Sequence, residues 1–176
     1  MAESEDLARI VSGCKKGVPE CFSQLVDMYA GRCYGYFYRL TGDKDLSDDL
    51  LSELFVKLVE KIGSYEGGSF ESWLFRVASN VFHDYLRDKQ RRRKSLDSQK
   101  RRLKSKLIET KQDKTNAIDK LQIQLGRLDA DTKELIMLRF YSRAKFKEIA
   151  KMRAEPIGTT LSKLHRGLKK LRELME

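Results

Sequence analysis

The sequence is poor in residues that break helices or build cross-linked frameworks. Its 176 residues include only two prolines and three cysteines. Strand-like alternation with hairpin turns does not occur, so the many long-chain charged residues predict an all-α protein. Cys14, Cys21 and Cys33 are odd in number and show no CxxC spacing, so we expect neither a disulfide framework nor a zinc site. The expectation is therefore a protein without a metal ion or cofactor.

Long apolar runs are also missing. No stretch approaches the roughly 18 consecutive apolar residues of a membrane span, and lipid-anchoring signals are not evident. The N-terminal sequence MAESEDLARI is acidic where a secretory signal would be basic. We expect a cytoplasmic protein with no membrane insertion.

What the sequence has in excess is positive charge, unevenly placed. Lys and Arg number 36 against 26 Asp and Glu, a net charge of +10. Residues 1–70 carry 8 basic and 12 acidic side chains, net −4, whereas residues 71–120 carry net +8 and residues 121–176 net +6. An acidic first part and a basic remainder favour one surface for a protein partner and another for phosphates.

A helix expected from about Asp45 to Ile62 has two different faces. Leucines and Phe55 form its apolar side, and four carboxylates gather roughly opposite: Asp45, Asp48, Asp49 and Glu53. Three interpretations are open: a docking face for a basic protein, a solvated face favoured by the helix dipole, or a divalent-metal site. One helix alone cannot wrap an ion, which weighs against the metal.

The segment SYEGGSF, residues 64–70, should form a tight loop because its paired glycines break helices. The next helix has an apolar stripe that includes Trp73 and an opposite face with Phe75, Arg76, Ser79, His83, Arg87 and Gln90, flanked by Asn80. An outward aromatic beside arginines and amides is typical of surfaces that stack on unpaired bases. Phe75 could equally pack on a neighbouring helix, and His83 is interpreted as a polar surface residue.

Few apolar residues occur between Arg91 and Lys114, a composition typical of a charged linker. This divides the chain into a helical domain over residues 1–93, a basic flexible linker over 94–117 and a second helical domain over 118–176. Asp129 is expected to cap a helix that ends near Tyr141.

The stretch from Glu148 to Leu171 predicts a helix-turn-helix. Its second helix should begin with Pro156 at the first position, where a missing N–H costs nothing. Spacings of three and four define its apolar stripe: Ile157, Leu161, Leu164, Leu168 and Leu171. Its polar side carries Thr159, Ser162, Lys163, Arg166 and Lys170. Such a basic helix favours binding in the major groove of DNA.

With these segments in place, the chain resembles the extracytoplasmic-function (ECF) sigma factors of bacterial RNA polymerase. DLSDDLLSELF at Asp45–Phe55 is similar to the family's DAEDLxQExF, and FESWLFRVASN at Phe70–Asn80 to its SFxxWLxxIAxN. LIMLRF, KEIA and GTTLSKLHRG follow in the family's order near the C-terminal end. The departures are Ser52 for Gln, Asp129 for Pro, Thr160 for Val and Leu161 for Lys or Arg.

The resemblance implies a non-catalytic transcription initiation factor with region 2-like and region 4-like domains, which binds core RNA polymerase and both duplex and melted promoter DNA. It implies an anti-sigma factor as a candidate partner. The residues it implies for the minus-35 helix are Thr159, Ser162, Lys163, His165, Arg166 and Lys170. For the minus-ten loop and helix they are Tyr65, Gly67, Ser69, Phe75, Arg76, Asn80, His83 and Arg87. For core polymerase they are Asp45, Asp48, Asp49 and Glu53.

Two other function classes compete with this interpretation. A helix-turn-helix also occurs in transcriptional regulators that act without polymerase, but a sensor pocket or dimerisation face is then expected in the N-terminal half. The acidic helix could alternatively serve a metal-dependent nuclease.

Overall fold

The computed structural model describes residues 2–100 and 120–176, and within these ranges all regular structure is helical. The elements are α1 (Ala2–Lys15), α2 (Pro19–Thr41), α3 (Lys44–Lys61), the 3-10 turn η1 (Ile62–Ser64), α4 (Phe70–Lys100), α5 (Lys120–Gly126), α6 (Ala130–Ser142), α7 (Phe146–Met152) and α8 (Ile157–Met175). The predicted all-α class is therefore confirmed. No described helix is both long and apolar enough to cross a membrane.

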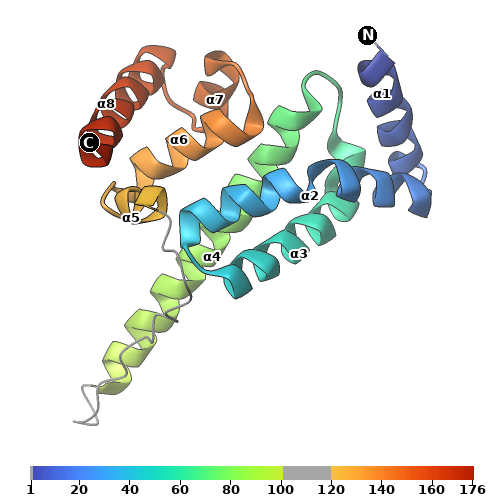
Figure 1. Ribbon diagram of the computed structural model, residues 1–176. Helices are drawn as coiled ribbons and strands as arrows, with labels where there is room; N and C mark the ends of the chain where they lie inside the picture. The colour runs from blue at the N-terminus through green and yellow to red at the C-terminus, as the bar shows by residue number, and fades with distance from the viewer. Residues whose placement is uncertain (1, 101–119) are drawn as a thin grey trace.

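Helices α1 to α4 form an N-terminal unit in which α2, α3 and α4 pack around one apolar core (Figure 1). Its fully buried side chains include Leu25, Tyr36 and Phe37 of α2, Leu54 and Leu58 of α3, and Leu74 and Phe75 of α4. Gly42 ends α2 in the left-handed conformation, with φ 71°. The carboxylate of Asp43 then accepts a hydrogen bond from Leu46 N at 3.0 Å and starts α3.

Helices α5 to α8 form a C-terminal unit centred on α6, whose Leu135, Ile136 and Leu138 are fully buried. The predicted cap of α6 is confirmed, because Asp129 Oδ1 accepts from Thr132 N at 2.8 Å. Pro156 is not the first helical residue as predicted. Its ψ of 143° is extended and its carbonyl accepts from Thr160 N, so it precedes α8 as the N-cap.

The two units contact each other along α2 and α4 on one side and α5, α6 and α7 on the other (Figure 1). The side chain of Tyr141 lies so close to Gly35 that a Cβ there would be within 3.1 Å of two ring carbons and the hydroxyl oxygen. Arg32 donates from Nε to the carbonyl of Tyr141 at 3.1 Å, and Lys133 donates to the carbonyl of Leu40 at 3.1 Å. Nothing in the sequence pattern predicted this arrangement.

Helix α4 continues past residue 94, the expected start of the linker, and ends at Lys100. Its 31 residues make it about 46 Å long, since a helix rises about 1.5 Å per residue. The remainder of the predicted linker, residues 101–117, and the first residues of the predicted second domain lie outside the described residues.

Candidate nucleic-acid and protein interfaces

The acidic face of α3, defined as Asp45, Asp48, Asp49 and Glu53, is exposed to solvent. None of its four carboxylates forms an ion pair with another described residue. Tyr34 and Tyr38 of α2 stack beside it with ring centroids 6.1 Å apart. Partial burial, followed by the charge of Asp48, raises the pKa of Tyr34. The face therefore combines carboxylates that lack an ion-pair partner among the described residues with an aromatic edge.

A metal site is not what this face resembles. Within residues 2–100 and 120–176, no group of three or more His, Cys, Asp or Glu side chains is arranged to hold a metal ion. A hard cation needs several oxygen ligands that converge on one position. The four carboxylates point outward from a single helix and do not converge.

The glycine loop, residues 65–69, is held in one shape by its own aromatic side chain. Gly67 and Gly68 have φ of 112° and 86°, which other residues rarely adopt. Tyr65 donates its hydroxyl to the carbonyl of Gly68 at 2.7 Å, and its ring lies 5.6 Å from that of Trp73. Ser69 Oγ accepts from Ser72 N at 3.1 Å and so caps α4. The loop is thus ordered by contacts that leave its glycines exposed.

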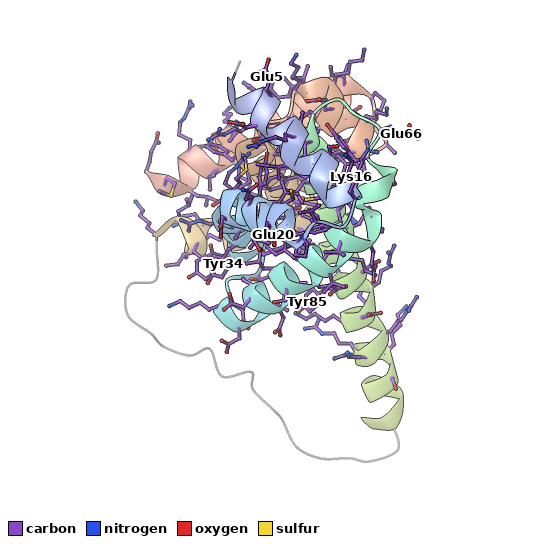
Figure 2. The ribbon with its side chains drawn as sticks, turned by 90° about the vertical axis from the view of Figure 1, so that its right-hand side faces the viewer. Glu5, Lys16, Glu20, Tyr34, Glu66 and Tyr85 are labelled. Atoms are coloured by element: carbon purple, nitrogen blue, oxygen red, sulfur yellow. The ribbon has the colours of Figure 1, made fainter. Side chains whose placement is uncertain are left out.

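Lys15 is a contact to this loop that the sequence did not indicate. It lies at the end of α1, 50 positions from the loop, and its ammonium group donates to the carbonyl of Tyr65. The same group sits 5.4 Å from the centre of the Tyr65 ring. Figure 2 shows the loop, marked by Glu66, beside the end of α1 that carries Lys16. An open cleft of about 410 Å³ lies between α1 and the loop.

Four of the predicted minus-ten residues form an exposed row along α4, at spacings of four, three and four. They are Arg76, Asn80, His83 and Arg87. The spacing places them on one helix face over about three turns. Arg87 pairs with Asp84, and His83 Nε2 lies 2.7 Å from Glu134 Oε2 of α6. The structure therefore brings these four together, with His83 at the border of the C-terminal unit.

Phe75 is the member of the predicted set that the structure contradicts. It is fully buried, with 0% of its surface exposed, so it cannot stack on a base. Its ring packs edge-on against Tyr36 at 5.5 Å, and the guanidinium carbon of Arg32 lies 5.6 Å from its centre. The apolar face of α4 is wider than the stripe suggests, because α4 packs against α6 as well as α2 and α3.

The predicted DNA side of α8 is largely exposed. Ser162, His165, Arg166 and Lys170 are open to solvent, and Thr159 is half-buried. Among the described residues, the Arg166 side chain donates only from Nε to the carbonyl of Ser162, at 3.3 Å. The turn before the helix contains Ala154 with φ 51°, a left-handed position that sets the angle between α7 and α8. Arg166 thus keeps most of its donors available to a ligand.

Lys163 differs from its neighbours because it is already paired. Its ammonium group lies 2.8 Å from Glu155 and 3.2 Å from Asp131, and these hydrogen bonds raise its pKa. Arg153, only 10% exposed, contacts the same two carboxylates. Burial would raise the pKa of Glu155, but hydrogen bonds from Lys163 and Arg153 outweigh it and lower that pKa. Lys163 is held in an intramolecular network.

The apolar stripe of α8 is only partly buried, contrary to the expected packing. Leu164 is 6% exposed, but Ile157, Leu161 and Leu168 are 47%, 42% and 37% exposed. Thr160 and Gly167 are buried in their place. Gly167 lets α6 approach closely, and the Thr160 hydroxyl donates to Glu155 at 3.1 Å, so the packed face is rotated toward these small residues.

Comparison with known proteins matches this architecture to two family models. Sigma-70 region 2 matches residues 25–92, and Sigma-70, region 4 matches residues 124–173. The ECF sigma factor SigE of Mycolicibacterium smegmatis is 29% identical over 88% of this chain, which spans 61% of that protein's length. SigW of Bacillus subtilis is 25% identical over 90% of this chain and 91% of its own.

A solved structure is similar as well. RpoE of Bartonella quintana, crystallised with the anti-sigma factor NepR, has a TM-score of 0.69 and 26% identity, covering 88% of this chain and 96% of that one. The matches fall on the two helical units described above and define an RNA polymerase sigma factor. The chain belongs to the sigma-70 family, and its relatives place it in the ECF group. It is a transcription initiation factor that directs RNA polymerase.

Proposed function

We propose that the chain binds core RNA polymerase and directs it to specific promoters by gripping DNA at two points, while catalysing no reaction itself. The observation that carries this proposal is the presence, on one chain, of two separate exposed rows of basic and hydrogen-bonding side chains. One lies on α4 and the other on α8. The polymerase-independent regulator is not favoured, because the N-terminal unit matches sigma-70 region 2 and not a sensor domain. We place this activity in the cytoplasm, where promoters and polymerase are found.

The minus-ten element is assigned to the glycine loop and the row on α4. Tyr65, Gly67 and Ser69 supply a rigid rim for one unpaired base, and Lys15 joins this set because it holds the Tyr65 carbonyl. The row of Arg76, Asn80, His83 and Arg87 supplies the cations and hydrogen-bonding groups that follow a single strand. Melting a few base pairs costs several kcal/mol, which capture of an unpaired base helps to offset.

The minus-35 element is assigned to α8. A recognition helix places its N-terminal residues on base edges, so Thr159, Ser162 and Arg166 are best positioned for the major groove. His165 and Lys170 lie toward the flanking phosphates. Lys163 is assigned a supporting role, since Asp131 and Glu155 already hold it. We assign the minus-ten contacts to a domain over residues 1–93, which the end of α4 extends, and the minus-35 contacts to a domain over residues 118–176.

Core polymerase is assigned to the acidic face of α3. Its exposed carboxylates favour a basic partner surface, and the adjoining tyrosine pair adds apolar contact area. An anti-sigma factor is proposed as a further partner. The support is the similarity to RpoE of Bartonella quintana, which was crystallised with one.

The experiment is reconstitution with purified core polymerase and a library of genomic promoters. We expect a stable complex and sequence-selective transcripts. The Asp49→Lys variant should bind core more weakly, whereas Asp27→Lys, a reversal at an exposed site on α2, should not. Failure of the parent to bind core would refute the proposed function. Equal loss in both variants would instead show that net charge, and not the acidic face, governs binding.

A further inference from the structure

Glu134 is a buried carboxylate of the C-terminal unit whose hydrogen-bond donors come mainly from the N-terminal unit. It is 5% exposed. Its Oε1 accepts from Ser79 of α4 at 2.6 Å and from the hydroxyl of Tyr36 at 3.4 Å, and its Oε2 lies 2.7 Å from His83 Nε2. Within its own unit, Glu134 Oε2 lies 3.7 Å from Nη1 of Arg153. The N-terminal unit therefore supplies most of the hydrogen-bond donors that this buried carboxylate requires.

These three donors form a receptor that fits a carboxylate. Burial, followed by the charge of Glu134, raises the pKa of Tyr36 well above its usual value, so its hydroxyl keeps its proton and donates. A buried charge is tolerated only where donors surround it, and bonds to charged groups are the stronger ones. Separation of the units would replace these donors with water. The surface of Tyr36, Ser79 and His83 is thus a binding site for the chain's own α6.

Glu134 also connects the two DNA-facing helices. On one side it contacts His83, which belongs to the exposed row on α4. On the other it contacts Arg153, which pairs with Asp131 and Glu155, the two carboxylates that hold Lys163 of α8. A strand that contacts His83 through Nε2 must compete with Glu134 for that atom. His83 is therefore used both in the proposed DNA contact and in the contact between the units.

The closed arrangement is too compact for the grip proposed above. The names of the minus-ten and minus-35 elements place them about 25 base pairs apart, which is about 85 Å of duplex at about 3.4 Å per base pair. Helices α4 and α8 both pack on α6, and packed helices lie about 8–10 Å apart, so their axes are within about 20 Å. Residues 101–119 join the units, and 19 residues can span at most about 65 Å. The units must separate to reach both elements.

We propose that Glu134 is the latch of a closed state that cannot engage both promoter elements, and that His83 Nε2 binds either this carboxylate or the promoter strand. The proposal rests on the function proposed above. It treats the free protein as a two-state molecule in which only the open state grips a promoter. Loss of the latch then raises promoter affinity by the factor through which it raises the open population.

The test uses the full chain with Glu134→Gln and Ser79→Ala. Glu134→Gln also removes a partner of Arg153 and so could weaken the C-terminal unit itself. Ser79→Ala removes one donor to Glu134 without changing any charge or the Arg153 network, so it tests the contact between the units separately. Ser12→Ala, at an exposed site on α1, is the matched control. The open-to-closed ratio should rise about tenfold or more, as expected for losing a hydrogen bond to a charged group. Small-angle X-ray scattering should show a larger radius of gyration for both variants, with helix content by circular dichroism unchanged.

Core binding and promoter binding, both starting from the free variant, are measured in parallel, because a latch in the free protein opposes both. Tighter binding that accompanies the larger radius supports the latch. An unchanged radius in both folded variants overturns it, and so does a larger radius with unchanged promoter affinity. A parent protein that binds neither core nor promoter, while the variants still expand, refutes the proposed function and leaves the contact between units standing.

Discussion

Gly167 offers a sharp test of how α8 is positioned. A Cβ added there would lie under 3.0 Å from the Thr132 methyl group, a separation that real Cβ atoms essentially never show, and 3.3 Å from Ile136 Cδ1. The Thr132 hydroxyl hydrogen-bonds Asp129, so rotating the methyl group away would break a bond at the cap of α6. Gly167→Ala must therefore push α8 away from α6.

Two opposing effects set the size of the change. Alanine stabilises a helix interior by about 1 kcal/mol relative to glycine. Overpacking of a close contact costs about 1–3 kcal/mol. Because the methyl group is held in place, we expect the cost to win and Gly167→Ala to destabilise the C-terminal unit by about 1 kcal/mol. In a Thr132→Ser background the obstructing methyl group is gone, and the same substitution should stabilise the unit by up to about 1 kcal/mol.

Native-state hydrogen exchange of the α8 amides measures both effects locally, without assuming that the two units unfold together. The coupling between the two substitutions should be about 1–2 kcal/mol, typical of side chains in contact. Slower exchange in the single Gly167→Ala variant would refute the reasoning. So would an identical effect of Gly167→Ala in both backgrounds, since the Thr132 methyl group would then play no part.

Three further predictions concern the binding surfaces. Arg166→Ala should weaken binding to duplex minus-35 DNA by about 1–3 kcal/mol, measured by fluorescence anisotropy, and Lys163→Ala should weaken it less, because Lys163 is held within the protein. The pKa of Asp131 is lowered, since hydrogen bonds from basic neighbours outweigh burial, so its contribution to stability is complete above its unfolded value of 3.8 and is lost as the pH falls through its lower folded value. The Asp131→Asn variant should therefore lose less stability on acidification, followed by circular dichroism. Lys15→Met should reduce permanganate reactivity of the minus-ten element in complexes with core polymerase, whereas Lys15→Arg and Lys16→Met should leave it near the parent's level.

The sequence predicted the positions of helices better than it predicted which of their side chains are exposed. Periodicity, Asp129 as a cap and the glycine pair located α3, α6 and the start of α4 to within a residue or two, because these signals are local, whereas α4 ends beyond the expected start of the linker. Phe75 was open to two interpretations because its environment is formed by Tyr36 and Arg32 of α2, about 40 positions away, and the spacing of apolar residues along α4 does not encode that contact. Long-range packing decides which sides of a helix are covered.

The same limit explains the errors on α8. Its leucines repeat at helical spacing, but Gly167 and Thr160 face α6 and the turn, and their small size determines the packed side. Lys163 looked like its basic neighbours in the sequence, and only the fold places Asp131 and Glu155 beside it. Lys15 and Glu134 had no signal at all, since each acts on residues 50 or more positions away.

The aromatic cluster around the glycine loop also makes the molecule its own optical probe. The sequence contains one tryptophan, Trp73, and its indole lies 5.6 Å from the rings of both Tyr65 and Phe70. Because no other indole of the chain contributes, its tryptophan fluorescence, excited selectively over the tyrosines, reports on the loop, while scattering follows the separation of the units. A stopped-flow titration with promoter DNA can therefore establish whether the loop responds before, with or after the opening of the molecule.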